Sequence, residues 1–167
     1  MTKPFLAALV FGFLAIAPNA HAEDIAPSIA AAFIMKVAAF EKNISGASSF
    51  TAYVAGDKPI KKELEKFVGR QTGTITLSKV TGGTTLPEVA PSVLVVGEDA
   101  DVNEIKAYLE SNSLLAIARG SSDFEGIVPV ELQLSRSGHP EVHIWLEVSS
   151  KLGLNWDPQI LKGAITH

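Results

Sequence analysis

The sequence predicts an α/β domain with a central, mostly parallel sheet flanked by helices, followed by a C-terminal antiparallel hairpin and a short closing helix. Two observations support this prediction. Over residues 25–118, short apolar or β-rich runs alternate with segments whose apolar side chains recur at helical spacing. At residues 127–146, two β-rich runs flank a turn-forming segment. Where strands joined through a helix are parallel, we expect right-handed crossovers.

The first 22 residues have the pattern of an export signal. Lys3 supplies a positive charge, and residues 5–17 are apolar. Ala20 and Ala22 place small residues at the two positions that signal peptidase reads, which predicts cleavage after Ala22. A permanent anchor is disfavoured because about 20 apolar residues are needed to cross a bilayer. We therefore expect residues 23–167 to form a single domain in the periplasm, with no membrane span.

Composition narrows the classes of function. Lys3 leaves with the leader, so 13 of the 14 basic side chains remain against 18 acidic ones, a net charge of about −5 with neutral histidines. A mildly acidic chain is a poor candidate for nucleic-acid binding, which needs clustered lysine and arginine. The chain has no cysteine, which excludes thiol catalysis, zinc–thiolate sites and iron–sulfur clusters.

The first part of the mature chain predicts a helix, a strand and a second helix. Residues 25–43 carry apolar side chains at helical spacing, with alanines between them. Ser49–Ala55 is rich in β-formers and ends at Gly56, after which Pro59 begins the second helix and Gly69 ends it. The expected core-facing residues of this second helix are Ile60, Leu64, Phe67 and Val68.

Three further strands and one helix follow. Residues 73–80 alternate apolar and polar side chains, as in a half-buried strand, and the glycines at 82–83 make a flexible turn. The apolar run at residues 92–96 predicts a central strand covered on both faces by helices. A capping box at residues 101–104 begins the next helix, and residues 114–118 form another short buried strand.

The C-terminal part changes character. Residues 127–134 and 141–146 are β-rich and flank a polar turn, which predicts an antiparallel hairpin. Gly153 then marks a break, and Asp157 with Pro158 opens a last short helix. The expected core-facing residues of this closing helix are Ile160, Leu161, Ala164 and Ile165.

Two glycines mark the candidate binding edge of the sheet. Gly56 and Gly97 each lie between a predicted strand and a predicted helix, where α/β folds often bind phosphates and small ligands. Neither belongs to a dinucleotide or Walker pattern, so a glycine that only allows the turn is favoured over a nucleotide loop. Five side chains are candidates for a ligand site at this edge, although capping or solvation explains each equally well: Asp57, Lys58, Glu98, Asp99 and Arg119.

A His–Glu–His pattern in the predicted hairpin is the best apparent metal cluster. On an extended strand His139 and His143 would lie about 13 Å apart, too far for one zinc ion whose ligands lie at about 2.1 Å. Unless a turn folds His139 back, a solvated hairpin rim is the favoured interpretation of these histidines and of Glu141 between them. We therefore expect no metal and no cofactor.

The sequence contains no recognisable catalytic constellation. It lacks the G-x-S-x-G elbow of a serine hydrolase, and His167 at the C-terminus is not expected to be held rigidly enough for a triad. Asp99 and Asp101 bracket a helix start, where acidic groups favour the helix dipole. Trp145 and Trp156 could stack on a ligand but are more often core residues. We therefore expect a protein that is not an enzyme.

Four stretches of the mature chain, in order between Ala30 and Ala164, carry a family resemblance. They are A-A-F-I at 31–34 with Phe40; V-A-G-D-K-P-I at 54–60 with Leu64 and Gly69; S-V-L-V-V at 92–96 with F-E-G-I-V at 124–128; and G-L at 153–154 with Ile160, Leu161 and Ala164. Together they resemble the YfiR-like family of periplasmic proteins. Most of these are packing residues, so the resemblance implies the fold more strongly than the function.

The resemblance implies a non-enzymatic periplasmic regulator that holds an inner-membrane signalling protein inactive by contacting its periplasmic sensor portion. That partner would typically be a diguanylate cyclase of cyclic-di-GMP signalling. Asn43 and Ile44 stand where the family has Trp-Pro, and the missing cysteines exclude a redox-controlled version. The alternative is a periplasmic small-ligand-binding protein that uses the loops at Gly56, Gly97 and Arg119. The sequence leaves the stimulus and a homodimer open.

Overall fold

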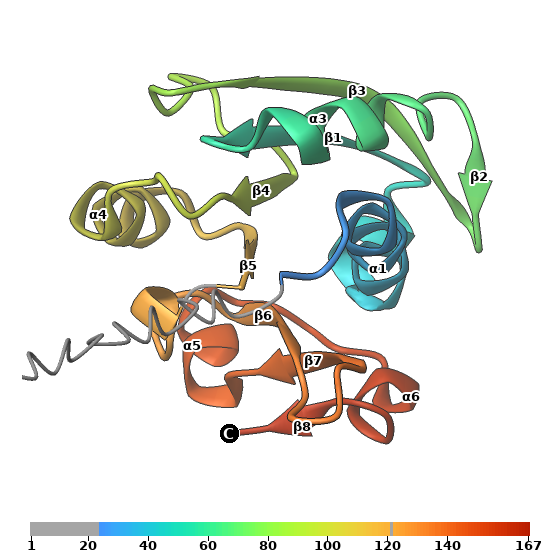
Figure 1. Cartoon of the computed structure of the whole chain (residues 1–167). Helices are drawn as coiled ribbons and strands as arrows, with labels where there is room; N and C mark the ends of the chain where they lie inside the picture. The colour runs from blue at the N-terminus through green and yellow to red at the C-terminus, as the bar shows by residue number, and fades with distance from the viewer. Residues whose placement is uncertain (1–23, 121) are drawn as a thin grey trace, which may run out of the picture.

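The computed structural model describes residues 24–120 and 122–167, which form an eight-stranded sheet with helices on both faces (Figure 1). The strand order is β2-β3-β1-β4-β5-β6-β7-β8. The predicted leader, with its cleavage site after Ala22, lies outside the described residues. Within them, no helix is long and apolar enough to span a bilayer.

Most neighbouring strands are parallel; β2–β3 and β6–β7 are the antiparallel pairs of the described sheet. The predicted fold class, a mostly parallel sheet with helices and a C-terminal hairpin, is confirmed. The strands are β1 (Ser49–Ala55), β2 (Gln71–Thr72), β3 (Ile75–Gly83), β4 (Val93–Val96), β5 (Leu115–Arg119), β6 (Val130–Leu134), β7 (Pro140–Ile144) and β8 (Ile165–Thr166). The helices are α1 (Pro27–Phe40), α2 (Lys42–Gly46), α3 (Lys58–Glu65), α4 (Val102–Asn112), α5 (Leu146–Lys151) and α6 (Pro158–Leu161), with a 3-10 turn η1 (Ser122–Phe124).

Strand β4 shows why the central strands are apolar throughout. Val93 and Val95 belong to the core that contains α1, α3 and α6, whereas Leu94 and Val96 belong to the core that contains α4. All four side chains are fully buried, and α1 and α4 lie on opposite sides of β4 and β5 (Figure 1). Because helices cover both faces, each position of the strand requires an apolar side chain, as the sequence predicted.

The connections after β1 and β4 run to opposite faces of the sheet. β1 continues into α3 on the α1 face and the chain returns as β3, whereas β4 continues into α4 on the other face and returns as β5. In the strand order, β3 and β5 flank the β1–β4 pair on its two sides. Doubly wound sheets bind ligands at the carboxyl ends of two such strands. Here those ends are followed by residues 56–57 and 97–99.

Aspartate side chains begin three of the helices. Asp57 Oδ1 accepts a hydrogen bond of 2.9 Å from a backbone N–H in the first turn of α3. Asp101 Oδ1 accepts from the backbone N–H groups of Asn103 and Glu104 at the start of α4, and Asp157 does the same for α6. Such caps typically stabilise a helix by about 1 kcal/mol. The three predicted helix starts are therefore confirmed.

The predicted first helix is divided into two. α1 ends at Phe40, and Glu41 adopts an extended backbone that forms an isolated bridge with Trp156. The buried side chain of Glu41 then begins α2 by accepting from the N–H of Ile44, at 2.9 Å, and it also accepts from the N–H of Asn155, at 2.8 Å. The prediction of a continuous helix was wrong because Glu41 ties this junction to the C-terminal segment.

Other predicted boundaries were wrong near the edges of the sheet. The glycines at 82–83 extend β3 along β1 instead of making a turn. Val68 lies beyond the end of α3 and is exposed, and Leu146 begins α5 rather than ending a strand. The closing helix stops at Leu161, and Ile165 is exposed in β8 because pairing with β7 replaces the helix there.

Candidate functional site

An ion pair between Asp57 and Arg119 spans the carboxyl edge of the sheet. Nη2 of Arg119 lies 2.9 Å from Oδ2 of Asp57, and Nε donates to the same oxygen at 3.1 Å. The side chains are only 13% and 4% exposed, respectively. Arg119 Nη1 also donates to the carbonyl oxygen of Ile25 at 2.9 Å. The pair therefore fastens β5, the start of α3 and the segment before α1 to one another.

Glu98 follows β4 and interacts with Asp24. A hydrogen bond with the Asp24 carboxyl group raises the pKa of Glu98; burial and the Asp24 charge add to this rise, whereas the Arg119 charge opposes it. A neighbouring carboxyl group disfavours the ionised form of Glu98. Glu98 is thus engaged with the segment before α1, as Arg119 is.

A cavity of about 710 Å³ opens at the carboxyl ends of β1 and β3, beside the loop that follows β4. Its lining comes from the end of β1, helix α3, the end of β3 with the segment after it, and the start of α4. Its position is the crevice that a doubly wound sheet predicts, and its volume lies in the common range of roughly 300–1,000 Å³ for small-molecule sites. Of the five side chains singled out from the sequence, Asp57, Lys58 and Asp99 line this cavity, whereas Glu98 and Arg119 are not among its lining residues.

Charged side chains are divided between two walls of the cavity. The α3 wall is basic and the wall at the start of α4 is acidic. The basic side chains are Lys58, Lys61 and Lys62, and the acidic ones are Asp99, Asp101 and Glu104. Glu65 and Asp57 also line the cavity, but their carboxylates are paired with Lys61 and Arg119, respectively. Of these two sets, only Lys58 and Asp99 were predicted from the sequence, because Lys62 and Glu104 resemble ordinary solvated helix residues until the fold brings α3 and the start of α4 together.

Backbone geometry accounts for the two glycines at this edge. Gly56 has a φ of +73°, in the left-handed region that favours glycine. A Cβ on Gly97 would lie 2.8 Å from Cβ of Asp57 and 2.9 Å from the carbonyl oxygen of Ala55. Only glycine therefore lets the end of β4 approach the end of β1 so closely.

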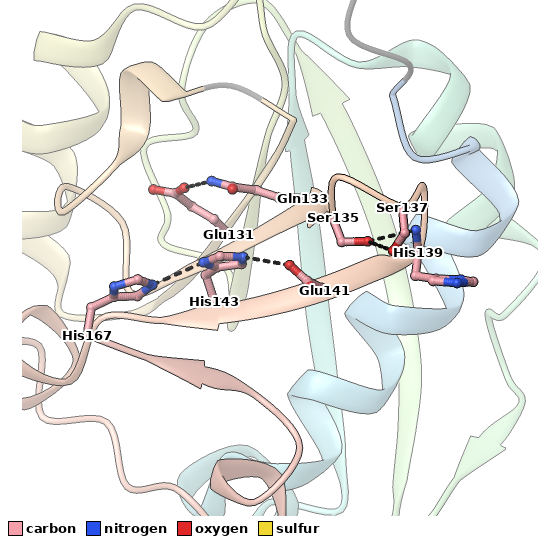
Figure 2. Close-up of polar contacts among 8 residues, drawn as sticks. All are labelled: Glu131, Gln133, Ser135, Ser137, His139, Glu141, His143 and His167. Carbon is pink, nitrogen blue, oxygen red and sulfur yellow. Dashed lines mark hydrogen bonds and ion pairs between the residues drawn. The ribbon is translucent and has the colours of Figure 1, made fainter.

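A second group of polar side chains lies on one face of the β6–β7 hairpin (Figure 2). In the antiparallel register, Glu131 is opposite His143 and Gln133 is opposite Glu141. Directly opposite residues share a face of the sheet, so the four side chains gather on one side. We call these four side chains, together with Trp145 and His167, the hairpin cluster.

Glu131 is the most deeply buried member of the hairpin cluster, at 1% exposure. Its Oε2 accepts a hydrogen bond of 2.6 Å from Nε2 of Gln133, whereas its Oε1 has no partner among the described residues, and neither does Nε1 of Trp145. Burial raises the pKa of Glu131 to about 7; the Glu125 charge adds to the rise, and Gln133 opposes it, as does the Trp145 N–H, which acts on this carboxyl group without reaching hydrogen-bond geometry. This carboxyl group can therefore change its protonation near neutral pH.

Two histidines complete the hairpin cluster. Nδ1 of His143 lies 3.0 Å from Nε2 of His167, so one nitrogen donates and the other accepts; Nε2 of His143 lies 3.6 Å from Oε2 of Glu141. The ring of His167 stacks on Trp145 with centroids 4.2 Å apart, and its backbone N–H bonds to β7. His167 is thus held in place, contrary to the prediction. His143 is not on a solvated rim either, whereas His139 is exposed, as expected.

The burial of Glu131 is not evident from the sequence, since Glu and Gln alternate with apolar residues along β6 as on a solvated face. Placing Glu131 opposite His143 in the predicted hairpin would have been the available signal. Trp156 is a core residue, as predicted. Trp145 is half-buried and stacks on His167, so its interpretation as a core residue was only partly right.

Across the described residues, no group of three or more His, Asp or Glu side chains is arranged to hold a metal ion. No protein-family model matches the sequence, and no curated protein matches it significantly. The cavity and the hairpin cluster therefore remain the two candidate sites in the described part of the chain.

Proposed function

We propose that the protein is a non-enzymatic periplasmic regulator that binds the periplasmic portion of an inner-membrane signalling protein. A diguanylate cyclase is the partner that the YfiR-like resemblance suggests. The observation that carries the proposal is where the resembling stretches fall in the fold. A-A-F-I lies in α1, V-A-G-D-K-P-I runs from β1 into α3, and S-V-L-V-V contains β4. The resemblance therefore follows the elements that build the sheet, in their order.

The arrangement of the carboxyl edge is consistent with a binding protein. Asp57 and Arg119 are engaged with each other, with a helix start and with a backbone carbonyl. Groups committed in this way hold elements together and are poorly placed to exchange protons with a substrate. Their role in the proposal is to maintain the surface that the partner recognises.

The test of the proposal is made in cells. Deleting the gene should raise cyclic-di-GMP if the partner is a cyclase held inactive, and restoring the full chain should lower it again. Crosslinking in intact cells should capture an inner-membrane protein with a periplasmic sensor portion. The matched control is a chain without residues 1–22, which should fold but neither restore the level nor crosslink.

Two results would contradict the proposal. One is an unchanged cyclic-di-GMP level together with no membrane protein in the crosslinked material. The other is full restoration by the chain without residues 1–22, since regulation would then not require export.

A periplasmic small-ligand-binding protein is the second candidate function, and the cavity of about 710 Å³ is the observation that favours it. A ligand that binds only the folded state raises the midpoint of thermal unfolding. Screening the purified protein against small metabolites by thermal shift tests this candidate. Absence of stabilisation by every compound would count against it.

A further inference from the structure

The basic wall of the cavity has ammonium groups without ionic partners. Lys58 and Lys62 both line the cavity from α3, and no ion pair among the described residues includes either of them. Lys61 differs, because its Nζ lies 2.5 Å from Glu65 on the same helix. Two lysines without ionic partners therefore border the cavity on one side, and the same two lysines border a second, shallower hollow beside Pro27.

The opposite wall has the complementary excess. Asp99, Asp101 and Glu104 line the cavity at the start of α4, and none of them forms an ion pair within the described residues. Asp101 uses Oδ1 to begin α4, which leaves its Oδ2 available. Among the residues that the structure describes, no ion pair joins the two walls, so opposite charges are separated by the cavity.

This separation selects the charge of a ligand. A simple anion would be attracted by the lysines but repelled by the three carboxylates. A simple cation would be attracted by the carboxylates but repelled by the lysines. A molecule with a cationic end and an anionic end satisfies both walls. Leu86 and Ile105 add apolar lining, which suits an uncharged body between the two ends.

The volume of the cavity restricts the length of the ligand. A compact cavity of about 710 Å³ is roughly 9 Å across, which two or three extended residues span at about 3.4 Å each. The two charges of a single amino acid are too close together to reach both walls. The segment after β3, which also lines the cavity, is held in place by two tyrosines. Tyr108 Oη donates to the carbonyl oxygen of Pro87 at 2.9 Å, and Tyr53 Oη donates to that of Thr85.

We propose that this cavity binds a dipeptide or tripeptide with free termini. The peptide ammonium group lies against Asp99 and Glu104, and the peptide carboxylate lies against Lys58 and Lys62. This assignment rests on the second candidate function, small-ligand binding, and gives it a ligand class. It does not depend on the regulatory proposal.

Calorimetric titration of the purified protein tests the assignment. Dialanine and trialanine should bind, whereas alanine, N-acetyl-dialanine and dialanine amide should bind at least about tenfold more weakly, because each lacks one charge-assisted contact or the length to make both. The double variant Lys58→Gln/Lys62→Gln should weaken dialanine binding by a similar factor. Lys66→Gln is the matched control: it also removes a lysine charge from the α3 region, but Lys66 does not line the cavity, so its affinity should equal that of the wild type.

Each contrary outcome is decisive. Equal binding of blocked and free peptides, or wild-type affinity in the double variant with unchanged circular dichroism, would overturn the peptide assignment. A neutral sugar or a simple anion that binds while peptides do not would overturn it but leave the second candidate function standing. Failure of every compound would remove both.

Discussion

The carboxyl edge and the hairpin cluster both bury a carboxyl group, but they treat it differently. Asp57 has a guanidinium on one oxygen and a helix N–H on the other. Glu131 has one amide donor, no cation and one oxygen without a partner among the described residues. A satisfied buried group fixes a structure, whereas an unsatisfied one makes the stability of that structure depend on protonation. The ion pair at the carboxyl edge therefore stabilises the fold, whereas the hairpin cluster contains a titratable group.

Removing the Asp57 carboxylate should have the largest effect. Asp57→Ala leaves the guanidinium of Arg119 buried without a counter-charge and removes the cap of α3, so we expect the free energy of unfolding to fall by about 4 kcal/mol. Urea denaturation measures it. Glu63→Ala, which breaks the more exposed Lys66–Glu63 pair, should cost at most about 1 kcal/mol. Similar losses in both variants would show that the Asp57–Arg119 pair stabilises the fold no more than an exposed ion pair does.

The close approach of β1 and β4 gives the next prediction. In Gly97→Ala the new Cβ meets backbone and Asp57 atoms at under 3 Å, so we expect a loss of about 2–3 kcal/mol in the free energy of unfolding. Gly46→Ala is the control because a Cβ there has open space. A Gly97→Ala protein as stable as the control would mean that the edge can relax.

Unlike the two substitutions at the carboxyl edge, Glu131→Gln should increase the free energy of unfolding. The pKa of Glu131 is about 7 in the folded state against an ordinary value of 4.5, so the folded state holds a proton that the unfolded state has lost between these values. The contribution of Glu131 to stability is therefore highest below pH 4.5, falls as the pH rises to about 7 and then levels off. The neutral glutamine removes this fall, so the variant should be more stable than the wild type by about 2 kcal/mol at pH 8.

Urea denaturation at pH 5 and pH 8 measures this effect. Glu125→Gln, which removes only the neighbouring charge that adds to the pKa rise, should give a smaller change in the same direction. If the wild type and Glu131→Gln have parallel pH profiles, Glu131 does not titrate as described.

The smallest effect is expected from His167→Ala. It removes the stacking on Trp145 and the hydrogen bond to His143, for a loss of about 1 kcal/mol and a change in tryptophan fluorescence. His139→Ala, in the exposed turn, should change neither. Equal fluorescence in the two variants would argue that the C-terminal residue is not ordered against the hairpin.

The same contrast explains what could be predicted from the sequence. Three features of the carboxyl edge have local roles that restrict the residue type. Asp57 begins a helix, Gly97 allows the ends of β1 and β4 to approach closely, and the apolar run of β4 fills a buried strand. The candidate edge was therefore found. Glu131 was missed because its surroundings include side chains outside its own strand, such as Trp145, and the alternating pattern of β6 describes only a polar face.

The sequence also did not predict which side chains at the carboxyl edge point toward the cavity. Glu98 and Arg119 follow their strands as expected, but the segment at residues 24–25 supplies partners that draw both of them away from the cavity. Conversely, Lys62 and Glu104 reach the cavity from helix turns that the sequence presents as solvated. Such placements depend on how two helices meet across the sheet, which periodicity does not encode.

The unequal lengths of β2 and β3 have a consequence for how copies of the protein behave at high concentration. β2 pairs with β3 only at Ile75 and Thr76, so beyond these residues the outer side of β3 has no strand beside it within the described sheet. Unpaired strand edges are where chains begin to aggregate by adding strands to one another. Lys79 is exposed on this stretch, and two copies joining there with two-fold symmetry would place like charges close together. We therefore expect Lys79, which lies outside both candidate sites, to disfavour association of copies along this edge.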